Sequence, residues 1–467
     1  MMISKPFPKS FAMACISVSL GASFTLADVV PNPLFTDGAV LQRGQKVPVW
    51  GTADNGEKVT VEIGKQKLTT TAEGGKWRVD LAPLEVGDPL TMKISGNNTI
   101  EIKEILVGEV WVNSGQSNME WLLKGIDPEK EYASKANYPK IRMFTVKKTT
   151  AIQPLASHTG SWITASPETV GGFSAVGYFF AQELHEKLGV PVGMISTSWG
   201  GTPAQAWTSI EGLESEAELI GYVDVAKKTI AAPPEKPVGS GHPTSLYNGM
   251  IAPIVPYAMK GVIWYQGESN AGKSKEYRTL FPAMIADWRN KWKQGNFPFI
   301  YVQIAPFKGQ PPEIREAQLM TLSKSENTAM AVTTDAGNAN DIHPKNKQPV
   351  GQRLAFAARA IAYGEKIVYS GPIYDSMKAS GDTIELSFKH LGGGLVAKDG
   401  DLKGFTLAGD DGKHVPAKAV IKGDKIIVSA DEVKAPKAAR YGWNNVPDVN
   451  LFNKEGFPAS PFRTDVD

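Results

Sequence analysis

Hydrophobic and polar residues alternate with a period of two over roughly residues 47–107. Val59, Val61 and Ile63 alternate with polar neighbours, and "KWRVDLA" and "LTMKI" repeat the pattern. Clusters of Gly, Asn and Asp separate these runs at hairpin spacing. Because successive side chains of a strand point to opposite faces, the pattern indicates strands with one buried face. Residues 28–106 are therefore predicted to form a small β-sandwich.

The pattern changes after residue 107, where short apolar runs alternate with longer helix-compatible stretches. The runs "VGMIST", "GVIWYQ", "FIYVQI" and "MAVTTD" have the length of buried strands, whereas "SAVGYFFAQELHEKLG" and "YRTLFPAMIADWRNKWK" have that of helices. Strands with helical crossovers form a parallel sheet with helices on both faces, so residues 107–364 are predicted to be an α/β domain. Period-two runs such as "DTIELSF" then return, and residues 365–467 are predicted to form a second β-domain.

The first 27 residues have the pattern of a secretory signal peptide. Two lysines precede an apolar stretch from Phe11 to Leu26, and small residues follow where a signal peptidase would cut. We predict that residues 1–27 are removed on export, with a buried first helix as the alternative, and that the mature chain begins near Asp28. The segment contains the single cysteine, Cys15, so the exported protein would have no thiols. A periplasmic or extracellular location is expected.

Charge and composition limit the class of partner. With 42% hydrophobic and 21% charged residues, the 467-residue chain has the composition of an ordinary globular protein. It has 50 Lys and Arg against 48 Asp and Glu, and loss of the two lysines in the signal segment would leave it formally neutral. A neutral chain without basic runs argues against nucleic acid and anionic membranes as partners. No later segment has the ~20 unbroken apolar residues of a membrane span.

Polar clusters follow four of the predicted strands. In open α/β sheets ligands bind at the carboxyl ends of the strands, so these clusters are candidates for a site. The first, "NSGQSNMEW", puts Ser117 between a strand and the start of a predicted helix, where backbone N–H groups point towards developing charge. It lacks the second glycine of the Gly-x-Ser-x-Gly elbow, which argues against an ordinary α/β-hydrolase. The second, "ISTSWGGTPAQAW", offers Gly200 and Gly201, whose N–H groups could bind an oxyanion.

The third cluster, "IWYQGESNA", combines two amides with a carboxylate. A carboxylate cannot donate to an oxyanion, so Gln266 or Asn270 is the better donor and Glu268 the better orienting group. The same cluster is equally compatible with a sugar-binding loop.

The fourth cluster, "NANDIHPKNKQ", holds an acid and a base two residues apart. Side chains two apart in an extended segment point to the same side, and Pro344 favours an extended conformation at His343. Asp341 could then bind one imidazole nitrogen while the other faces a hydroxyl, as in a Ser-His-Asp triad. The sequence has no histidine pair at metal-ligand spacing, and neither a metal nor another cofactor is predicted.

Taken together, the motifs resemble the sialate O-acetylesterase family. "GQSNMEW", "ISTSWGGTPAQAW", "LYNGMIAPI", "WYQGESNA", "DIHPKNKQ" and "NLFNKEGFPASPFRTD" occur in that family's order, and the resemblance covers essentially the whole mature chain. It implies an SGNH (GDSL-like) hydrolase: a parallel sheet flanked by helices, with N-terminal and C-terminal β-domains. The implied activity is hydrolysis of acetyl esters on sugars through a serine nucleophile, without a cofactor.

The resemblance also implies roles for individual residues. They are the nucleophile Ser117, the general base His343, its partner Asp341, and the oxyanion donors Ser117, Gly201 and Gln266. The acid and the histidine are one residue closer than in the usual SGNH block. This spacing leaves open whether Asp341 or Glu268 orients His343.

The implied substrate is a 9-O-acetylated sialic acid, whose carboxylate requires a nearby cation. Arg315 in "EIREAQ" is the candidate, with a surface salt bridge as its alternative role. Further substrate contacts are expected from Asn118, Glu268 and Asn270. Similar proteins deacetylate xylan, so an acetylxylan esterase is a second hypothesis and a non-catalytic carbohydrate-binding protein a third. The sequence does not indicate the oligomeric state.

Overall fold

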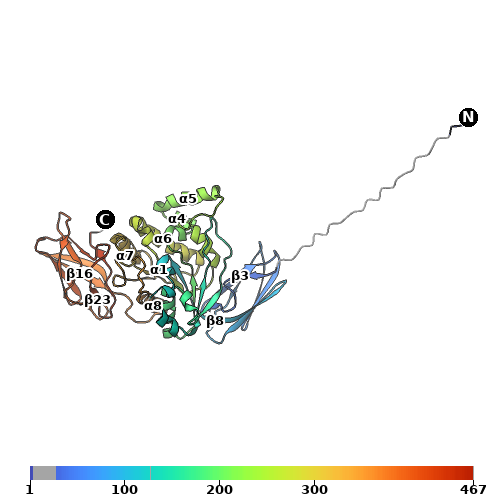
Figure 1. Cartoon of the computed structure of the whole chain (residues 1–467), viewed down its shortest axis with the longest axis horizontal. Coiled ribbons are helices and arrows are strands. Elements are labelled where there is room, and N and C mark those ends of the chain that lie inside the picture. The colour runs from blue at the N-terminus through green and yellow to red at the C-terminus, as the bar shows by residue number, and fades with distance from the viewer. Residues whose placement is uncertain (4–27, 127, 466–467) are drawn as a thin grey trace.

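The computed structural model describes residues 1–3, 28–126 and 128–465. The predicted signal peptide, including Cys15, falls on residues 4–27 and so lies outside the described residues. A central α/β region has a β region at each end of the molecule (Figure 1). The predicted fold class, a mostly parallel sheet flanked by helices with N-terminal and C-terminal β regions, is confirmed.

The N-terminal region consists of short strands, most of which pair antiparallel. These are β1 (Val30–Pro31), β2 (Val40–Gln42), β3 (Val47–Thr52), β4 (Lys58–Ile63), β5 (Gln66–Thr71), β6 (Lys76–Leu81) and β7 (Leu90–Ser95). β3 lies between β1 and β6, and β4 lies between β5 and β7. Buried positions alternate with more exposed ones along β4 and β6, as the period-two pattern predicted.

The long strand β8 (Thr99–Gly115) belongs to both the N-terminal and the central region. Its first residues pair antiparallel with β7, and Leu106–Gly108 pair in parallel with β2. Its last residues lie between two parallel strands of the central sheet. The boundary predicted after residue 106 therefore falls within a continuous strand, and one hydrophobic core runs through both regions.

The central sheet has the strand order β10-β9-β11-β8-β12-β13-β14, with β10 antiparallel at one edge. Its other strands are β9 (Tyr138–Thr145), β10 (Trp162–Ala165), β11 (Val192–Ser196), β12 (Gly261–Tyr265), β13 (Phe299–Val302) and β14 (Thr328–Ala331). β8 comes first in the chain but lies in the middle, and later strands add on both sides. Its carboxyl end is therefore at a topological switch point, where α/β sheets bind ligands.

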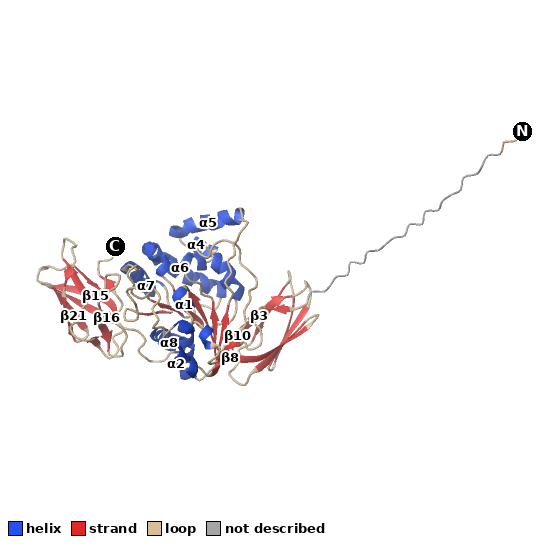
Figure 2. Cartoon of the chain, in the orientation of Figure 1, coloured by secondary structure: helices blue, strands red, loops and turns tan. Residues whose placement is uncertain are grey.

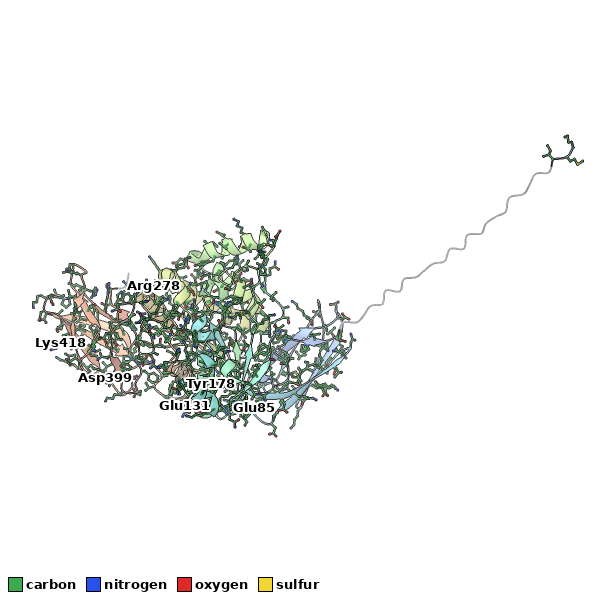
Figure 3. All side chains as sticks on the ribbon, viewed as in Figure 1. Glu85, Glu131, Tyr178, Arg278, Asp399 and Lys418 are labelled. Atoms are coloured by element: carbon green, nitrogen blue, oxygen red, sulfur yellow. The ribbon has the colours of Figure 1, made fainter. Side chains whose placement is uncertain are left out.

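Helices cover both faces of this sheet. They are α1 (Ser117–Glu120), α2 (Glu129–Lys135), α3 (Ala175–Leu188), α4 (Ile210–Glu214), α5 (Ile220–Ala231), α6 (Ser274–Trp292), α7 (Pro312–Lys324) and α8 (Gln348–Tyr363). α3 packs against α8, whereas α6 packs against α4 and α7 (Figure 2). Tyr178 of α3 and Arg278 of α6 lie in separate parts of the central region in Figure 3. No helix in the described part is both long and apolar enough to cross a membrane.

Local sequence signals explain the ends of α3. The Ser174 side chain caps the helix by accepting a 3.1 Å hydrogen bond from the N–H of Gly177. Gly189 ends the helix with a φ of 68°, which a glycine adopts without strain.

The C-terminal region has a hydrophobic core of its own. One sheet contains β15 (Ile373–Ser380), β16 (Thr383–Lys389), β21 (Lys425–Ser429) and β20 (Lys418–Lys422). A second sheet contains β19 (Val415–Pro416), β18 (Phe405–Ala408), β22 (Ala438–Tyr441) and β24 (Phe462–Arg463), and β17 (Leu395–Ala397) pairs with β23 (Leu451–Asn453).

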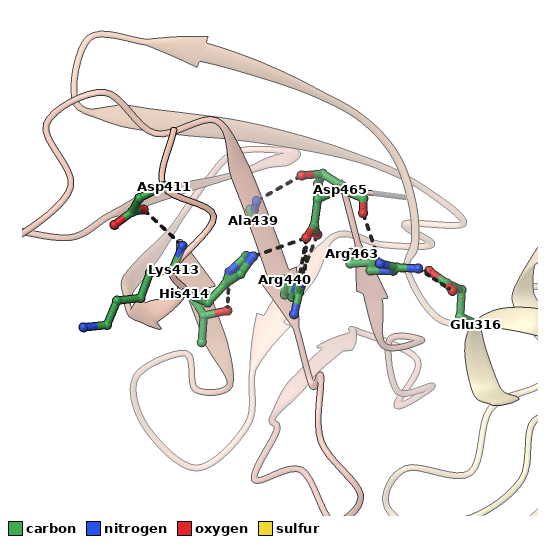
Figure 4. Close-up of polar contacts among 10 residues, drawn as sticks. Glu316, Asp411, Lys413, His414, Ala439, Arg440, Arg463 and Asp465 are labelled. Atoms are coloured by element: carbon green, nitrogen blue, oxygen red, sulfur yellow. Dashed lines mark hydrogen bonds and ion pairs between the residues drawn. The ribbon is translucent and has the colours of Figure 1, made fainter. Parts of the chain in front are cut away.

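An ion pair joins this region to α7 (Figure 4). Arg463 Nε of β24 lies 2.7 Å from Glu316 Oε1, and both side chains are largely buried. Glu316 also binds Arg278 of α6 at 2.5 Å. Because removing one partner would leave buried charge uncompensated, this cluster fixes the C-terminal region against the central one.

Candidate active site

Ser117 lies at a sharp turn where β8 ends. Gly115 has a φ of 137°, and a Cβ there would lie 2.1 Å from the carbonyl oxygen of Tyr265, so only glycine fits. The chain then forms α1, which is a single turn and shorter than the helix predicted from "SNMEWLL". The helix ends early because Trp121 adopts extended backbone angles (φ −51°, ψ 120°). The turn leaves Ser117 half-buried at the carboxyl edge of the sheet.

The structure brings the Ser117 hydroxyl to the imidazole of His343. Nε2 of His343 lies 2.8 Å from Oγ of Ser117, although the two residues are 226 positions apart. Trp121 stacks on the imidazole, with ring centroids 5.0 Å apart and planes inclined by 22°. Burial and the positive charge of Lys347 lower the pKa of His343, while the Asp341 carboxylate opposes them. A neutral imidazole hydrogen-bonded to a hydroxyl can act as its general base.

Asp341 contacts His343 mainly through the backbone. Its Oδ1 accepts a 2.8 Å hydrogen bond from the N–H of His343 and lies 3.9 Å from the ring Nδ1. The predicted extended segment is instead bent at Ile342 and His343, because the carboxylate closes a local turn. The sequence left open whether Asp341 or Glu268 orients His343. In the structure Asp341 lies beside the imidazole ring, whereas the Glu268 carboxylate binds Asn118.

Two backbone N–H groups near the serine turn have no acceptor among the described residues. The loop after β11 passes so close that a Cβ on Gly200 would lie 3.2 Å from Cβ of Ser117. The N–H of Gly200 donates to Glu120 at 2.6 Å. By contrast, the N–H groups of Ser117 and Gly201 donate to no residue that the structure describes. They remain available to an oxyanion.

Gln266 and Asn270 lie inside the protein. Gln266 Nε2 donates to Asn270 Oδ1 at 2.7 Å and to the Thr202 carbonyl at 3.2 Å. Asn270 Nδ2 donates to Gln205, and its Oδ1 also accepts from the N–H of Ala204. The oxyanion role expected for Gln266 and the substrate contact expected for Asn270 are therefore corrected, because these amides bind the loop after β12 to the loop after β11.

Asn118 and Glu268 form a buried polar chain beneath Ser117. Asn118 Nδ2 donates to Glu268 Oε1 at 2.6 Å, and Asn118 Oδ1 accepts from Lys347 Nζ. Burial raises the pKa of Glu268 and lowers that of Lys347 to about 7. Since Asn118 and Glu268 are buried and bound to each other, the substrate contacts expected for them are corrected. Lys347 and Trp121 were not predicted as site residues, although they lie within the motifs "DIHPKNKQ" and "GQSNMEW".

Arg315 is fully buried, whereas both of its predicted roles require an exposed side chain. Its guanidinium donates to the backbone carbonyls of Asn444 and Asn445, which connects α7 to the C-terminal region. The expectation that Arg315 binds a substrate carboxylate or forms a surface salt bridge is therefore corrected.

A pocket of about 370 Å³ opens over the serine and the histidine. It is lined by Ser117, Glu120, Trp121, Leu122, Lys124, Gly125 and His343. A larger groove of about 650 Å³ lies between the N-terminal and central regions, and neither Ser117 nor His343 lines it. Among the described residues, no group of three His, Cys, Asp or Glu side chains could hold a metal ion.

Comparisons with known proteins identify the family of the chain. Residues 107–360 match the family described as carbohydrate esterase, sialic acid-specific acetylesterase. The chain is 32% identical to the sialate O-acetylesterase of Homo sapiens, over 95% of this chain and 93% of that protein. The corresponding Mus musculus protein is 30% identical, over 93% and 92%. A carbohydrate acetylesterase from Xanthomonas citri has a similar crystal structure, with a TM-score of 0.87 and 40% identity over 94% of this chain and all of that chain.

The position of Asp341 predicts different effects for two substitutions. Asp341→Asn keeps the oxygen that accepts from the N–H of His343 but removes the charge, which at about 4 Å in a solvated site is worth about 1 kcal/mol. We expect hydrolysis of 4-nitrophenyl acetate to fall by less than about tenfold. The acid limb of the pH profile should move to lower pH, because the carboxylate raises the pKa of His343.

Asp341→Ala also removes the acceptor that holds the His343 backbone, so kcat should fall further, by up to about 10²-fold. Steady-state kinetics across pH would compare the two variants. If kcat fell equally in Asp341→Asn and Asp341→Ala, the effect of Asp341 would come from its charge on the imidazole ring and not from its hydrogen bond to the backbone.

Proposed function

The chain belongs to the sialic acid-specific acetylesterase family of carbohydrate esterases, and we propose that Ser117 and His343 perform its reaction. It is a carboxylic ester hydrolase that acts on O-acetylated sugars. The observation that carries the proposal is the 2.8 Å contact between His343 Nε2 and Ser117 Oγ at the end of β8. Membership of an esterase family argues against the third hypothesis, a non-catalytic carbohydrate-binding protein.

The reaction follows from this geometry. Ser117 Oγ attacks the acetyl carbonyl while His343 Nε2 takes the hydroxyl proton. The N–H groups of Ser117 and Gly201 donate to the oxyanion that forms. The C–O bond to the sugar then breaks, and the leaving alkoxide takes the proton from His343. His343 then deprotonates a water molecule, which attacks the acetyl-serine. The bond between the acyl carbon and Ser117 Oγ breaks, Oγ takes the proton back from His343, and acetate leaves.

Replacing the nucleophile should abolish turnover. We expect Ser117→Ala to lower kcat for 4-nitrophenyl acetate by roughly 10⁴–10⁶-fold, as for other serine hydrolases that lose one member of a catalytic unit. Ser269→Ala is the matched control, because Ser269 is an exposed serine on the neighbouring loop. Acetate release and thermal melting would be measured together. A folded Ser117→Ala protein with undiminished acetate release would contradict the mechanism.

We propose 9-O-acetylated sialic acid as the preferred substrate, with Lys124 in the role first expected for Arg315. Lys124 is exposed on the pocket wall and forms no ion pair with any residue in the described ranges. Glu120, the acid that lines the pocket, pairs with Lys148. Lys124 is therefore the charged residue of the lining that is left to bind the carboxylate of an anionic sugar. Acetylated xylan, the substrate of the second hypothesis, has no carboxylate at this position.

Lys124→Met should discriminate between these substrates. A charge-assisted hydrogen bond contributes about 1.5–3 kcal/mol, and at an exposed site we expect the lower value, which corresponds to about a tenfold increase in KM for a 9-O-acetylated sialoside. KM for acetylated xylo-oligosaccharide should not change, and Lys124→Arg should retain sialoside binding. Equal changes for both substrates would exclude carboxylate recognition by Lys124.

We also propose that the protein is exported to the periplasm or the medium. The support is the sequence of residues 1–27, with its basic start and apolar stretch. N-terminal sequencing of the protein from the exported fraction should begin near Asp28. A chain that retains Met1 and stays with the cytosolic fraction would contradict the proposal.

A further inference from the structure

A buried polar chain connects the nucleophile turn to the loop of His343 from beneath the pocket. Lys347 is 0% exposed and Asn118 1%, so neither side chain can contact a substrate. Lys347 Nζ donates to Asn118 Oδ1, and Asn118 Nδ2 donates to Glu268 Oε1 and, at 3.0 Å, to the carbonyl of Ile342. The mechanism proposed above, on which the present inference rests, assigns no role to Lys347.

The side-chain amide of Asn118 has a single possible orientation in this chain. Both of its hydrogens are donated to oxygens, and its oxygen accepts from an ammonium group, so a flipped amide would oppose like dipoles on every side. Asn118 follows Ser117 directly and Ile342 precedes His343. The amide therefore fixes the position of Ser117 relative to His343, and the hydrogen bond from Lys347 fixes the amide.

The stability of the fold does not explain why a lysine occupies position 347. It occupies the N-cap of α8, where the helix dipole disfavours positive charge, and it is fully buried. An apolar side chain of similar size is commonly as stable or more stable at such a place. The ammonium is compensated by Glu268, through Asn118, and lies 5.5 Å from the centre of the Tyr265 ring. A charge that is buried beside Ser117 and His343, although its burial lowers the stability of the fold, indicates a role in the reaction.

We propose that Lys347 is a positioning residue that holds Asn118 beneath Ser117 and His343, and whose positive charge keeps the His343 imidazole ready to accept the serine proton.

The charges around His343 support this assignment. Asp341 lies on the same loop as His343. Glu120, which is paired with Lys148, and Lys124 line the same pocket as His343. Burial and Lys347 lower the pKa of His343, and Asp341 raises it. Burial lowers the pKa of Lys347 itself to about 7, against the opposing effects of Glu268 and Asp341. Removing the ammonium would therefore raise the pKa of His343 and leave more of it protonated at a given pH.

Two variants separate the charge from the hydrogen bond. Lys347→Gln removes the charge but keeps an N–H donor, whereas Lys347→Met removes both. For 4-nitrophenyl acetate, we expect both to move the acid limb of kcat/KM to higher pH, opposite to Asp341→Asn. In Lys347→Met, kcat at the pH optimum should also fall, by up to about 10²-fold, because Asn118 loses its donor. Lys345→Met is the control, since Lys345 is an exposed lysine on the same loop.

The outcomes are distinct. An acid limb at the wild-type position in either folded variant would overturn the proposal, and thermal melting identifies a variant that has not folded. If Lys347→Met does not fold, Lys347→Gln still tests the charge. Activity retained by Ser117→Ala would instead refute the proposed function, whatever the Lys347 variants do.

Discussion

The parallel register of β8 between β11 and β12 is the constraint on which the site depends. It sets Asn113 opposite Ser196 of β11 and Gly115 opposite Tyr265 of β12. The loops that follow these strands therefore meet at one edge of the sheet, above the centre of the fold. Ser117 can lie there only because Gly115 lets the chain pass the carbonyl of Tyr265. The nucleophile turn and its neighbouring N–H donors follow from this arrangement.

Most polar side chains at this edge stabilise the loops and do not face the pocket. Gln266 binds Asn270 and the carbonyl of Thr202, and Asn118 binds Glu268. A buried amide or carboxylate without a partner costs free energy, so these groups hydrogen-bond to one another across the strand ends. The pocket itself is lined by a different set, which includes Trp121 and Lys124. The buried polar side chains thus position the groups that line the pocket.

Opposing charges act on the histidine from two sides. The Asp341 carboxylate raises the pKa of His343, and the buried Lys347 ammonium lowers it. Asp341 is solvated and 3.9 Å from the ring, whereas Lys347 is fully buried, where charge is screened less. The acid-base behaviour of the site therefore depends on a residue beneath the pocket as well as on the acid beside the base.

The sequence by itself determined the regular elements with a clear local period, such as β11, β12, β13, α3 and α6. It singled out Ser117 and His343 from motifs that follow predicted strands. It also indicated the family, from the order of those motifs. Only the tertiary structure decided that β8 continues through the expected boundary, that Arg315 and Gln266 are buried, and that Lys347 lies beneath the serine. These properties arise from contacts between residues far apart in the chain, such as the 229 positions between Asn118 and Lys347. A local pattern identifies which residues are polar, but burial and partners depend on the packing of distant segments.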